Sequence, residues 1–472
     1  MPAMPPASSE VSEIDSSARG PLSLLIVSAL GWLIVSGVLA IVHYVQTLNP
    51  AFLADCAWFT YGRLRGLQET AFIYGWVANS GFVVALWILG RLSGSPLRSL
   101  NWLTVGAIFW NVGVLLGLIG IAAGDGTSTP FLRMPHYVQL LLLIAYGAMA
   151  VPGVLAWTGR NRARTFAAQW YAVAALFLFP WLFSAAQLTL VWFPVRGALQ
   201  AVAAGWFAQS VWTLWIAPIA LSAAYYLVPK ITGRVIPNYD FASLSFWTLL
   251  FVGGWTGGRH LIGGPVPAWV PTIAIVSCAL LTFHYIVTAM NLRHAFLGRG
   301  GVALKFVAAG VAAYVVGGMA DAVTSLRGVA QLTQFTWMTQ AQSQLAINGG
   351  FSLIVFGAIY FLVPRIANQP WPSTALVRAH FAAALIGTFG LVIALAAAGL
   401  VQGAALNDAA VSFGEIAQRS RPWILAAAGA QAVLLLGNLV LAVHFVRLLT
   451  TKPATTAVDL FRQPPTMEAS VS

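Results

Sequence analysis

Long apolar stretches with very few charges recur along almost the whole chain, and each is long enough to cross a lipid bilayer. A transmembrane helix needs about 20 mostly apolar residues. A segment in hydrocarbon must also satisfy its own backbone hydrogen bonds, which favours helices. About twelve stretches qualify, at residues 22–46, 66–90, 99–123, 136–157, 165–192, 197–228, 241–262, 268–297, 303–325, 336–363, 377–403 and 421–449. The sequence therefore predicts an all-α integral membrane protein.

The composition excludes a soluble protein and a membrane β-barrel. Of the 472 residues, 59% are hydrophobic and 8% are charged, whereas about a quarter are charged in soluble proteins. Barrel strands would alternate apolar and polar residues over about 10 positions, and these stretches do not. We expect one twelve-helix membrane domain at residues 21–450, a disordered cytoplasmic tail at 1–20 and a cytoplasmic tail at 451–472.

The net charge of +12 is explained by membrane orientation. With twelve spans both termini lie on one side, and that side collects sixteen of the arginines and lysines against eight on the other. Cytoplasmic loops carry such a basic excess. We therefore expect a plasma-membrane protein of the bacterial type with both termini cytoplasmic, in contact with lipid and not with nucleic acid.

A short set of polar residues falls at membrane depth, where such residues are costly and are functional-site candidates. The set consists of Gln68, Glu69, Gln209, Ser210, Arg259, His260, His284, Asp321, Gln340, Gln342, Gln344 and Asn348. The two cysteines, Cys56 and Cys278, have no metal-binding spacing and are interpreted as small core residues.

Each polar candidate also has a purely structural interpretation. Glutamines can join helices by hydrogen bonds worth about 0.6 kcal/mol on average. Glu69, Arg259 and His260 lie near span ends and can extend to the interface. His284 can be a hydrogen-bonded core residue. Asp321 is the strongest outlier, although Arg327, about two turns further along, can partly compensate its charge.

Three stretches carry a family resemblance. They are "AAYYLVPKITGRVIPNYDFASLSFWTLLFVGGWTGGRHLIGGPVPAW" (Ala223–Trp269), "FGAIYFLVPRI" (Phe356–Ile366) and "YGRLRGLQETAFIYGW" (Tyr61–Trp76). Together they resemble the catalytic subunit I of cbb3-type cytochrome c oxidases, the C-family haem–copper oxidases. Order and spacing agree over about residues 60–370. The resemblance implies a twelve-helix fold and, if the family's chemistry were retained, haem b and copper.

The resemblance also implies six histidine positions that hold these metals, plus a tyrosine near copper that would fall on Gly253. Low-spin haem takes ligands from the second and tenth helices, high-spin haem takes a second ligand from the tenth, and copper takes ligands from the sixth and seventh. In this sequence the haem-ligand positions fall on Gln68, Gln342 and Gln344, and the copper-ligand positions fall on Gln209, Arg259 and His260.

Five of these six positions are therefore not histidine. A guanidinium offers no lone pair, an amide is a weak ligand for haem iron, and one histidine cannot hold copper alone. We predict no bound cofactor, no metal site and no catalytic residue. The larger side chains of Trp212, Trp215, Leu345 and Ile347 would then fill the former haem space, and the glutamines would join the second, sixth and tenth helices by hydrogen bonds. Gln340 lies outside the pattern.

Three functional hypotheses remain open. The first is a degenerate, metal-free subunit with a structural, assembly or regulatory role beside other membrane subunits, cytochrome c-like ones among them. The second is an active terminal oxidase or nitric-oxide reductase with unusual ligation, which leaves enzymatic activity undecided. The third is a transporter or channel whose path is lined by Glu69, Arg259, His260 and Asp321.

Overall fold

The computed structural model describes residues 8–161, 164–297 and 300–450, and this part of the chain is helical without strands. Its α-helices are α1 (Ser8–Ser17), α2 (Arg19–Leu48), α3 (Tyr61–Thr70), α4 (Ala78–Ser93), α5 (Leu100–Ala123), α6 (His136–Thr158), α7 (Ala167–Gln187), α8 (Ala198–Ser210), α9 (Ala217–Thr232), α10 (Asp240–Val252), α11 (Trp269–Asn291), α12 (His294–Leu297), α13 (Val302–Thr324), α14 (Arg327–Thr333), α15 (Trp337–Gln344), α16 (Ile354–Ala367), α17 (Thr374–Leu406) and α18 (Phe413–Thr450). Short 3₁₀ helices run over Ala57–Phe59 and Gly253–Leu261.

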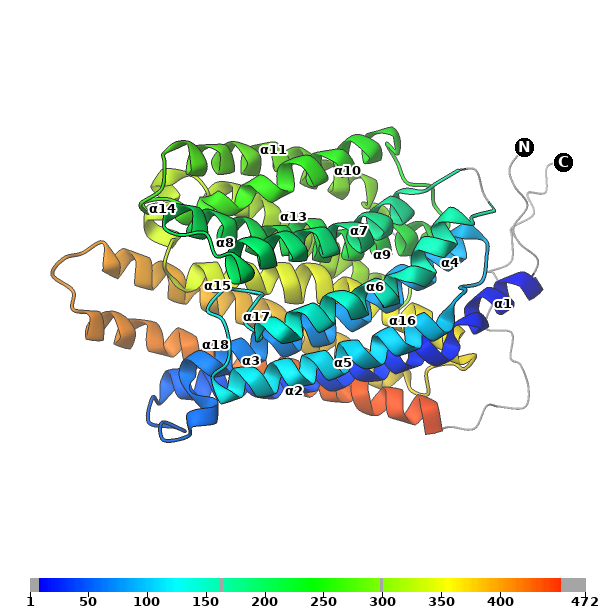
Figure 1. The fold of residues 1–472 in the computed structure, drawn as a ribbon, viewed down its shortest axis with the longest axis horizontal. Helices are drawn as coiled ribbons and strands as arrows, with labels where there is room; N and C mark the ends of the chain where they lie inside the picture. Colours follow the sequence, from blue (N-terminus) through cyan, green and yellow to red (C-terminus); the bar gives the residue numbers. More distant parts are fainter. Residues whose placement is uncertain (1–7, 162–163, 298–299, 451–472) are drawn as a thin grey trace.

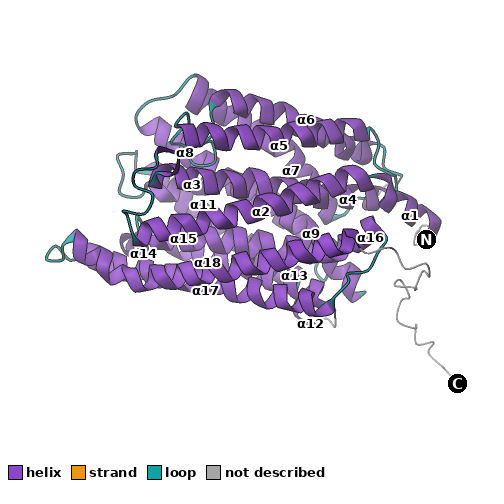
Figure 2. Ribbon diagram, turned by 90° about the horizontal axis from the view of Figure 1, so that it is seen from below, coloured by secondary structure: helices purple, strands orange, loops and turns teal. Residues whose placement is uncertain are grey.

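The long helices lie side by side in one bundle. α1, α4 and α16 mark one end, and α3, α8, α14 and α15 mark the opposite end (Figure 1). The connecting loops gather at these two ends (Figure 2). The hairpin of α17 and α18 extends past the other helices at the end opposite α1 (Figure 1). This arrangement is that of a multi-pass membrane protein.

Eleven helices in the described residues are long and apolar enough to cross a membrane. They coincide with eleven of the twelve predicted spans. The predicted seventh span, 241–262, is instead α10 followed by the 3₁₀ helix Gly253–Leu261, which we call the 3₁₀ segment. Four glycines in the 3₁₀ segment explain the difference, because glycine disfavours the α-helix. The spans keep the predicted numbering below, with α10 and the 3₁₀ segment as the seventh.

Three spans form the interior of the bundle. The apolar windows of Tyr61–Ser93, Ala198–Thr232 and Trp337–Ala367 are 94%, 100% and 78% buried, against 50% or less in each of the other eight. These are the second, sixth and tenth spans, from which the resemblance places haem and copper ligands. The sequence and the packing therefore single out the same three helices.

Each of these three central spans changes from α- to π-helix part-way along its length. The π-helical segments are Ala71–Val77, Val211–Ile216 and Leu345–Leu353. They begin within three residues of Gln68, Gln209 and Gln344. π-helical turns are frequent at functional sites. A fourth π-helical segment, Leu188–Trp192, ends the fifth span, so this feature is not confined to the central helices.

The prediction of disorder over residues 1–20 is wrong for the part that the structure describes, since Ser8–Ser17 forms α1. The helix packs against α4 and α16. Asp15 Oδ1 lies 3.5 Å from Arg91 Nη1. Burial raises the pKa of the Asp15 carboxyl, and the charge of Arg91 opposes that shift. Residues 1–7 and the predicted tail at 451–472 lie outside the described residues.

Candidate functional site

A cavity of about 440 Å³ lies between the second, sixth and tenth spans. All six positions that the resemblance assigns to metal ligands line it, and so do Glu69, Asp321 and Gln340. These residues come from segments far apart in the sequence, and of the ionisable candidates His284 alone does not line the cavity. The structure thus gathers most of the predicted polar residues around one space.

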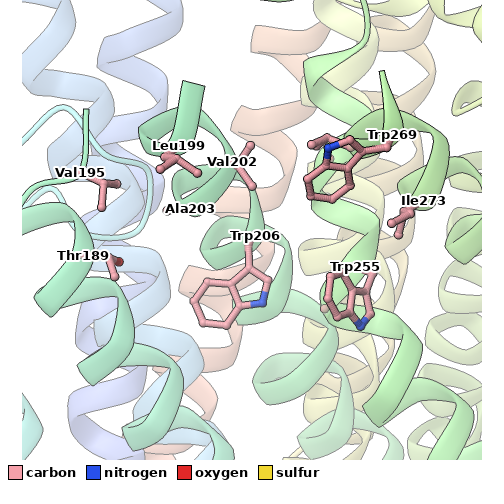
Figure 3. Close-up of a pocket in the computed structure, with 12 residues that line it drawn as sticks. Thr189, Val195, Leu199, Val202, Ala203, Trp206, Trp255, Trp269 and Ile273 are labelled. Carbon is pink, nitrogen blue, oxygen red and sulfur yellow. The ribbon is translucent and has the colours of Figure 1, made fainter. Parts of the chain in front are cut away.

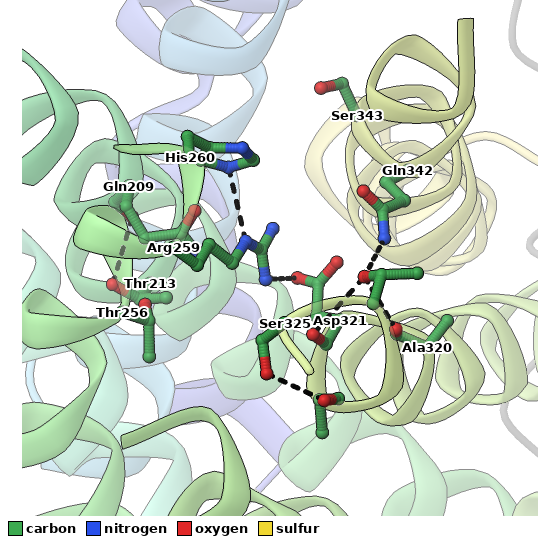
Figure 4. Close-up of polar contacts among 12 residues, drawn as sticks. Gln209, Thr213, Thr256, Arg259, His260, Ala320, Asp321, Ser325, Gln342 and Ser343 are labelled. Carbon is green, nitrogen blue, oxygen red and sulfur yellow. Dashed lines mark hydrogen bonds and ion pairs between the residues drawn. The ribbon is translucent and has the colours of Figure 1, made fainter. Parts of the chain in front are cut away.

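Arg259 and Asp321 form an ion pair beside the cavity. Arg259 Nη1 lies 2.8 Å from Asp321 Oδ2, and the side chains are 9% and 17% exposed (Figure 4). Arg259 Nε donates to His260 Nε2 at 3.2 Å. The interfacial interpretation of Arg259 is therefore wrong, because a charge so buried needs a partner and has one.

The expected compensation of Asp321 by Arg327 is also wrong. α13 ends at Thr324, and Arg327 begins the separate helix α14, so the helical spacing between the two residues is broken. Arg327 Nη2 donates to Thr272 Oγ1 at 3.0 Å instead. The true partner, Arg259, is more than sixty residues away in the sequence.

Glu69 forms a second ion pair on the cavity wall. Its Oε2 accepts a hydrogen bond from Arg133 Nε at 3.2 Å, and its Oε1 accepts one from the backbone N–H of Phe131 at 2.5 Å. Both charged side chains are less than one-fifth exposed. Glu69 therefore ties α3 to the loop before α6, and it does not extend to the membrane interface.

The glutamines do not join the three central helices to one another, contrary to the sequence-based prediction. Gln342 Nε2 donates to Thr324 Oγ1 of α13 at 2.6 Å (Figure 4), and Gln344 Oε1 accepts from Asn348 on its own helix. The side chains of Gln68, Gln209 and Gln340 make no hydrogen bond with any residue that the structure describes. They face the cavity, where no protein atom is close enough to pair with them.

His284 is a core residue. It is fully buried, with Nδ1 2.8 Å from Ser245 Oγ and Nε2 2.9 Å from Tyr314 Oη. Both ring nitrogens are satisfied and neither faces the cavity. The structural interpretation of this residue holds.

The bulky residues fill only part of the space. Trp212 and Ile347 line the cavity. Trp215 is buried with its ring centroid 4.1 Å from that of Phe179, and Leu345 is buried at 8% exposure. A cavity lined by both polar and apolar side chains persists between the central helices.

The residues around the cavity fit neither haem iron nor copper. His260 Nε2 is in contact with the guanidinium of Arg259, and that permanent positive charge opposes a metal ion. The amide nitrogen of Gln342 is bonded to Thr324. In the described part of the chain, no three His, Cys, Asp or Glu side chains lie together as a metal site. The arrangement supplies ion pairs and amides, and not the imidazole set that these metals need.

The sequence did not identify several further residues of the cavity wall as candidates. Among them are His43, Tyr61, Arg65 and Arg133. Arg65 and Glu69 are four residues apart and therefore share a helix face. That spacing alone could have placed Arg65 beside Glu69. Arg133 lies between helices, and no local pattern could place it here.

A second pocket, of about 280 Å³, is apolar and lies at the outer surface. Trp206 of α8 and Trp255 of the 3₁₀ segment stand on either side of it (Figure 3). Trp255 and Trp269 are each 59% exposed. Such rings suit the edge of a membrane, and the pocket offers no group for chemistry.

Comparison with known proteins agrees with the fold. Residues 21–433 match the family described as "Cytochrome C and Quinol oxidase polypeptide I". The cbb3-type cytochrome c oxidase subunit CcoN1 of Stutzerimonas stutzeri is 23% identical over 90% of this chain and 93% of its own length. A bacteroid cytochrome c oxidase subunit 1 homolog of Bradyrhizobium diazoefficiens is 24% identical over 93% of this chain and 83% of its own. A solved heme–copper terminal oxidase dimer has the same fold, with a TM-score of 0.70 and 15% identity over 95% of this chain and 85% of that one.

Proposed function

Because the chain belongs to the cytochrome c and quinol oxidase polypeptide I family, we propose that it is a metal-free member with a structural, assembly or regulatory role. It would act within a respiratory-type complex of the bacterial plasma membrane, with both termini cytoplasmic. One observation carries the proposal: the six corresponding ligand positions line one cavity, and five hold glutamine or arginine. Fold alone does not confer the family's chemistry.

The contacts of these residues support the proposal as much as their identity does. Arg259 is committed to Asp321, and Gln342 is committed to Thr324. Haem or copper would have to break these contacts and leave a buried charge or amide without a partner, which is costly. The present residues therefore stabilise a fold that works without metal.

Partners of this subunit would be other membrane proteins, including cytochrome c-like subunits, within the lipid bilayer. Two matched relatives carry "subunit" in their names, and the matched structure is a dimer of a terminal oxidase. A scaffold that keeps the family's fold keeps surfaces on which such partners can dock.

Haem and copper analysis of the isolated chain tests the proposal. The chain would be expressed alone in a host that matures cbb3-type oxidases, with the CcoN1 relative expressed in parallel as the control. We expect a haem Soret band and copper in the relative, and neither in this protein. A Soret band with near-stoichiometric iron in this protein would contradict the proposal, and oxygen consumption with an artificial donor would favour an active oxidase.

Transport is a second candidate function, favoured by one observation. The four ionisable residues expected along a path, Glu69, Arg259, His260 and Asp321, all line the same cavity. Flux of a small ion into proteoliposomes, lowered in the double variant Arg259→Gln with Asp321→Asn, which leaves no charge buried without a partner, would support transport. Flux equal to that of empty liposomes would exclude it for that ion.

A further inference from the structure

The cavity wall carries polar groups that the protein itself leaves unpaired. The amides of Gln68, Gln209, Gln340 and Gln431 line it without a side-chain hydrogen bond to any described residue. His43 also lines it, and its buried Nδ1 lacks a partner in the described part of the chain. These amides face open space in the cavity, and polar groups in such a place are satisfied by water or by a polar solute. A cavity of this size, lined by both polar and apolar side chains, has room for several waters or for a small solute.

The charges around the cavity do not cancel. Three arginines, Arg65, Arg133 and Arg259, face two acids, Glu69 and Asp321. Arg133 is paired with Glu69, and Arg259 is paired with Asp321. Arg65 forms no ion pair with any residue that the structure describes, and an arginine side chain stays protonated. The cavity therefore carries one uncompensated positive charge.

The position of Arg65 determines where a solute meets this charge. Arg65 is exposed and lies in the first turns of α3, at the end of the bundle opposite α1 (Figure 1). Tyr61 and Phe131 line the cavity at the same end. Gln209 and Gln344 also line the cavity, and they lie two residues and one residue before the π-helical segments of their spans. A charged side chain with partial access to water, followed by amide donors, is the arrangement that attracts and holds a small anion.

We propose that this cavity is a binding site for a small monovalent anion, held by the guanidinium of Arg65 and the amide N–H groups of Gln68 and Gln340. The anion enters from the end of the bundle opposite α1. The site rests on the proposed function in one respect, because it requires that no haem occupies the cavity. It adds a ligand class that a purely structural subunit does not need.

Charge-selective thiol labelling tests the site. The half-buried thiol of Cys56 is first removed by Cys56→Ser, which leaves only the buried Cys278. A reporter cysteine is then placed by Ala208→Cys, at an alanine that lines the cavity. The matched control is Phe413→Cys, at a residue 75% exposed on the hairpin of α17 and α18. Modification rates are measured with an anionic sulfonatoethyl and a cationic trimethylammonioethyl methanethiosulfonate, and the anion-to-cation ratio is compared between the two positions.

We expect the ratio at Ala208→Cys to exceed that at Phe413→Cys by about tenfold, as one focused charge allows. Arg65→Gln should reduce the ratio to that of the control, and Arg65→Lys should retain most of it. Excess thiocyanate should slow the reaction of the anionic reagent only when residue 65 is basic. Equal ratios at both positions, no labelling of the cavity cysteine, or a ratio indifferent to Arg65→Gln would overturn the proposal.

Haem content measured on the same preparations separates the two proposals. A Soret band would overturn the metal-free function and the anion site together. Haem-free protein without charge selectivity would overturn the anion site and leave the metal-free function intact. If the Arg65→Gln variant does not elute as a monodisperse peak, the test rests on the protein that retains Arg65. If excess thiocyanate then does not slow the anionic reagent, the anion site is overturned.

Discussion

The guanidinium of Arg259 lies 2.8 Å from the carboxylate of Asp321, and this contact joins the 3₁₀ segment to α13 at the wall of the central cavity. The family resemblance assigns Arg259 to a copper-ligand position. At that position the chain carries a positively charged guanidinium, which cannot act as a metal ligand. The carboxylate of Asp321 on α13 neutralises it. Four predictions follow from this and related contacts.

Asp321→Asn should destabilise the protein strongly, because it leaves the charge of Arg259 buried without a partner. Loss of one member of a buried pair costs about 3–5 kcal/mol. The measurement is the midpoint of thermal unfolding in detergent. The double variant Arg259→Gln with Asp321→Asn should recover much of the loss, since no charge then remains buried. A single variant as stable as the parent would mean that the pair is exposed to water.

Glu69→Ala should loosen the loop before α6, because Glu69 accepts hydrogen bonds from Arg133 and from the backbone of Phe131. We expect a loss of about 1–3 kcal/mol and faster limited proteolysis at residues 124–135. Glu69→Gln keeps an acceptor for Phe131 and should lose less. As a control, Glu415→Gln removes the exposed pair with Arg419, where we expect under about 1 kcal/mol. Equal effects of Glu69→Ala and Glu415→Gln would refute the buried role of Glu69.

Gly257→Ala should push the 3₁₀ segment away from α8. A Cβ atom at Gly257 would lie 2.2 Å from the carbonyl oxygen of Gly205, which is backbone and cannot rotate away. We expect a loss of about 1–3 kcal/mol and weaker pairing of Arg259 with Asp321. Gly62→Ala is the matched control, because a Cβ there meets nothing within 4 Å. The two unfolding midpoints are compared, and a tolerated Gly257→Ala would argue against this close approach.

His284→Ala should destabilise the fold and leave the cavity unchanged. It removes the contacts with Ser245 and Tyr314 and creates a void, together worth about 2–5 kcal/mol. His284→Gln, which retains a donor and an acceptor, should lose less. Labelling of the Ala208→Cys reporter should keep its anion-to-cation ratio in the folded fraction. A changed ratio would place His284 at the cavity after all.

The family resemblance read from three short stretches agrees with the comparison over residues 21–433. Sequence also singled out Gln68, Gln209, Gln342 and Gln344, which the structure places around one cavity, because their distances along the chain from aromatic and proline anchors can be counted directly. Sequence did not identify Arg65 as a candidate. Its charge is the uncompensated one only because Arg133 and Arg259 are each paired with an acid, and those pairs are visible only in the structure.

The amino-acid sequence by itself determined which stretches are long and apolar enough to cross a membrane, and the family resemblance assigned residues to the ligand positions. Both are local properties, because burial of an apolar stretch and self-contained hydrogen bonding need no distant partner. The tertiary structure alone decided which charges neutralise one another and which amides face an open cavity. The close approach of Gly257 to Gly205 and the ion pair of Arg259 with Asp321 both join segments that are far apart in the sequence. Contacts between segments so far apart depend on how helices pack, and hydrophobic patterning leaves that packing undetermined.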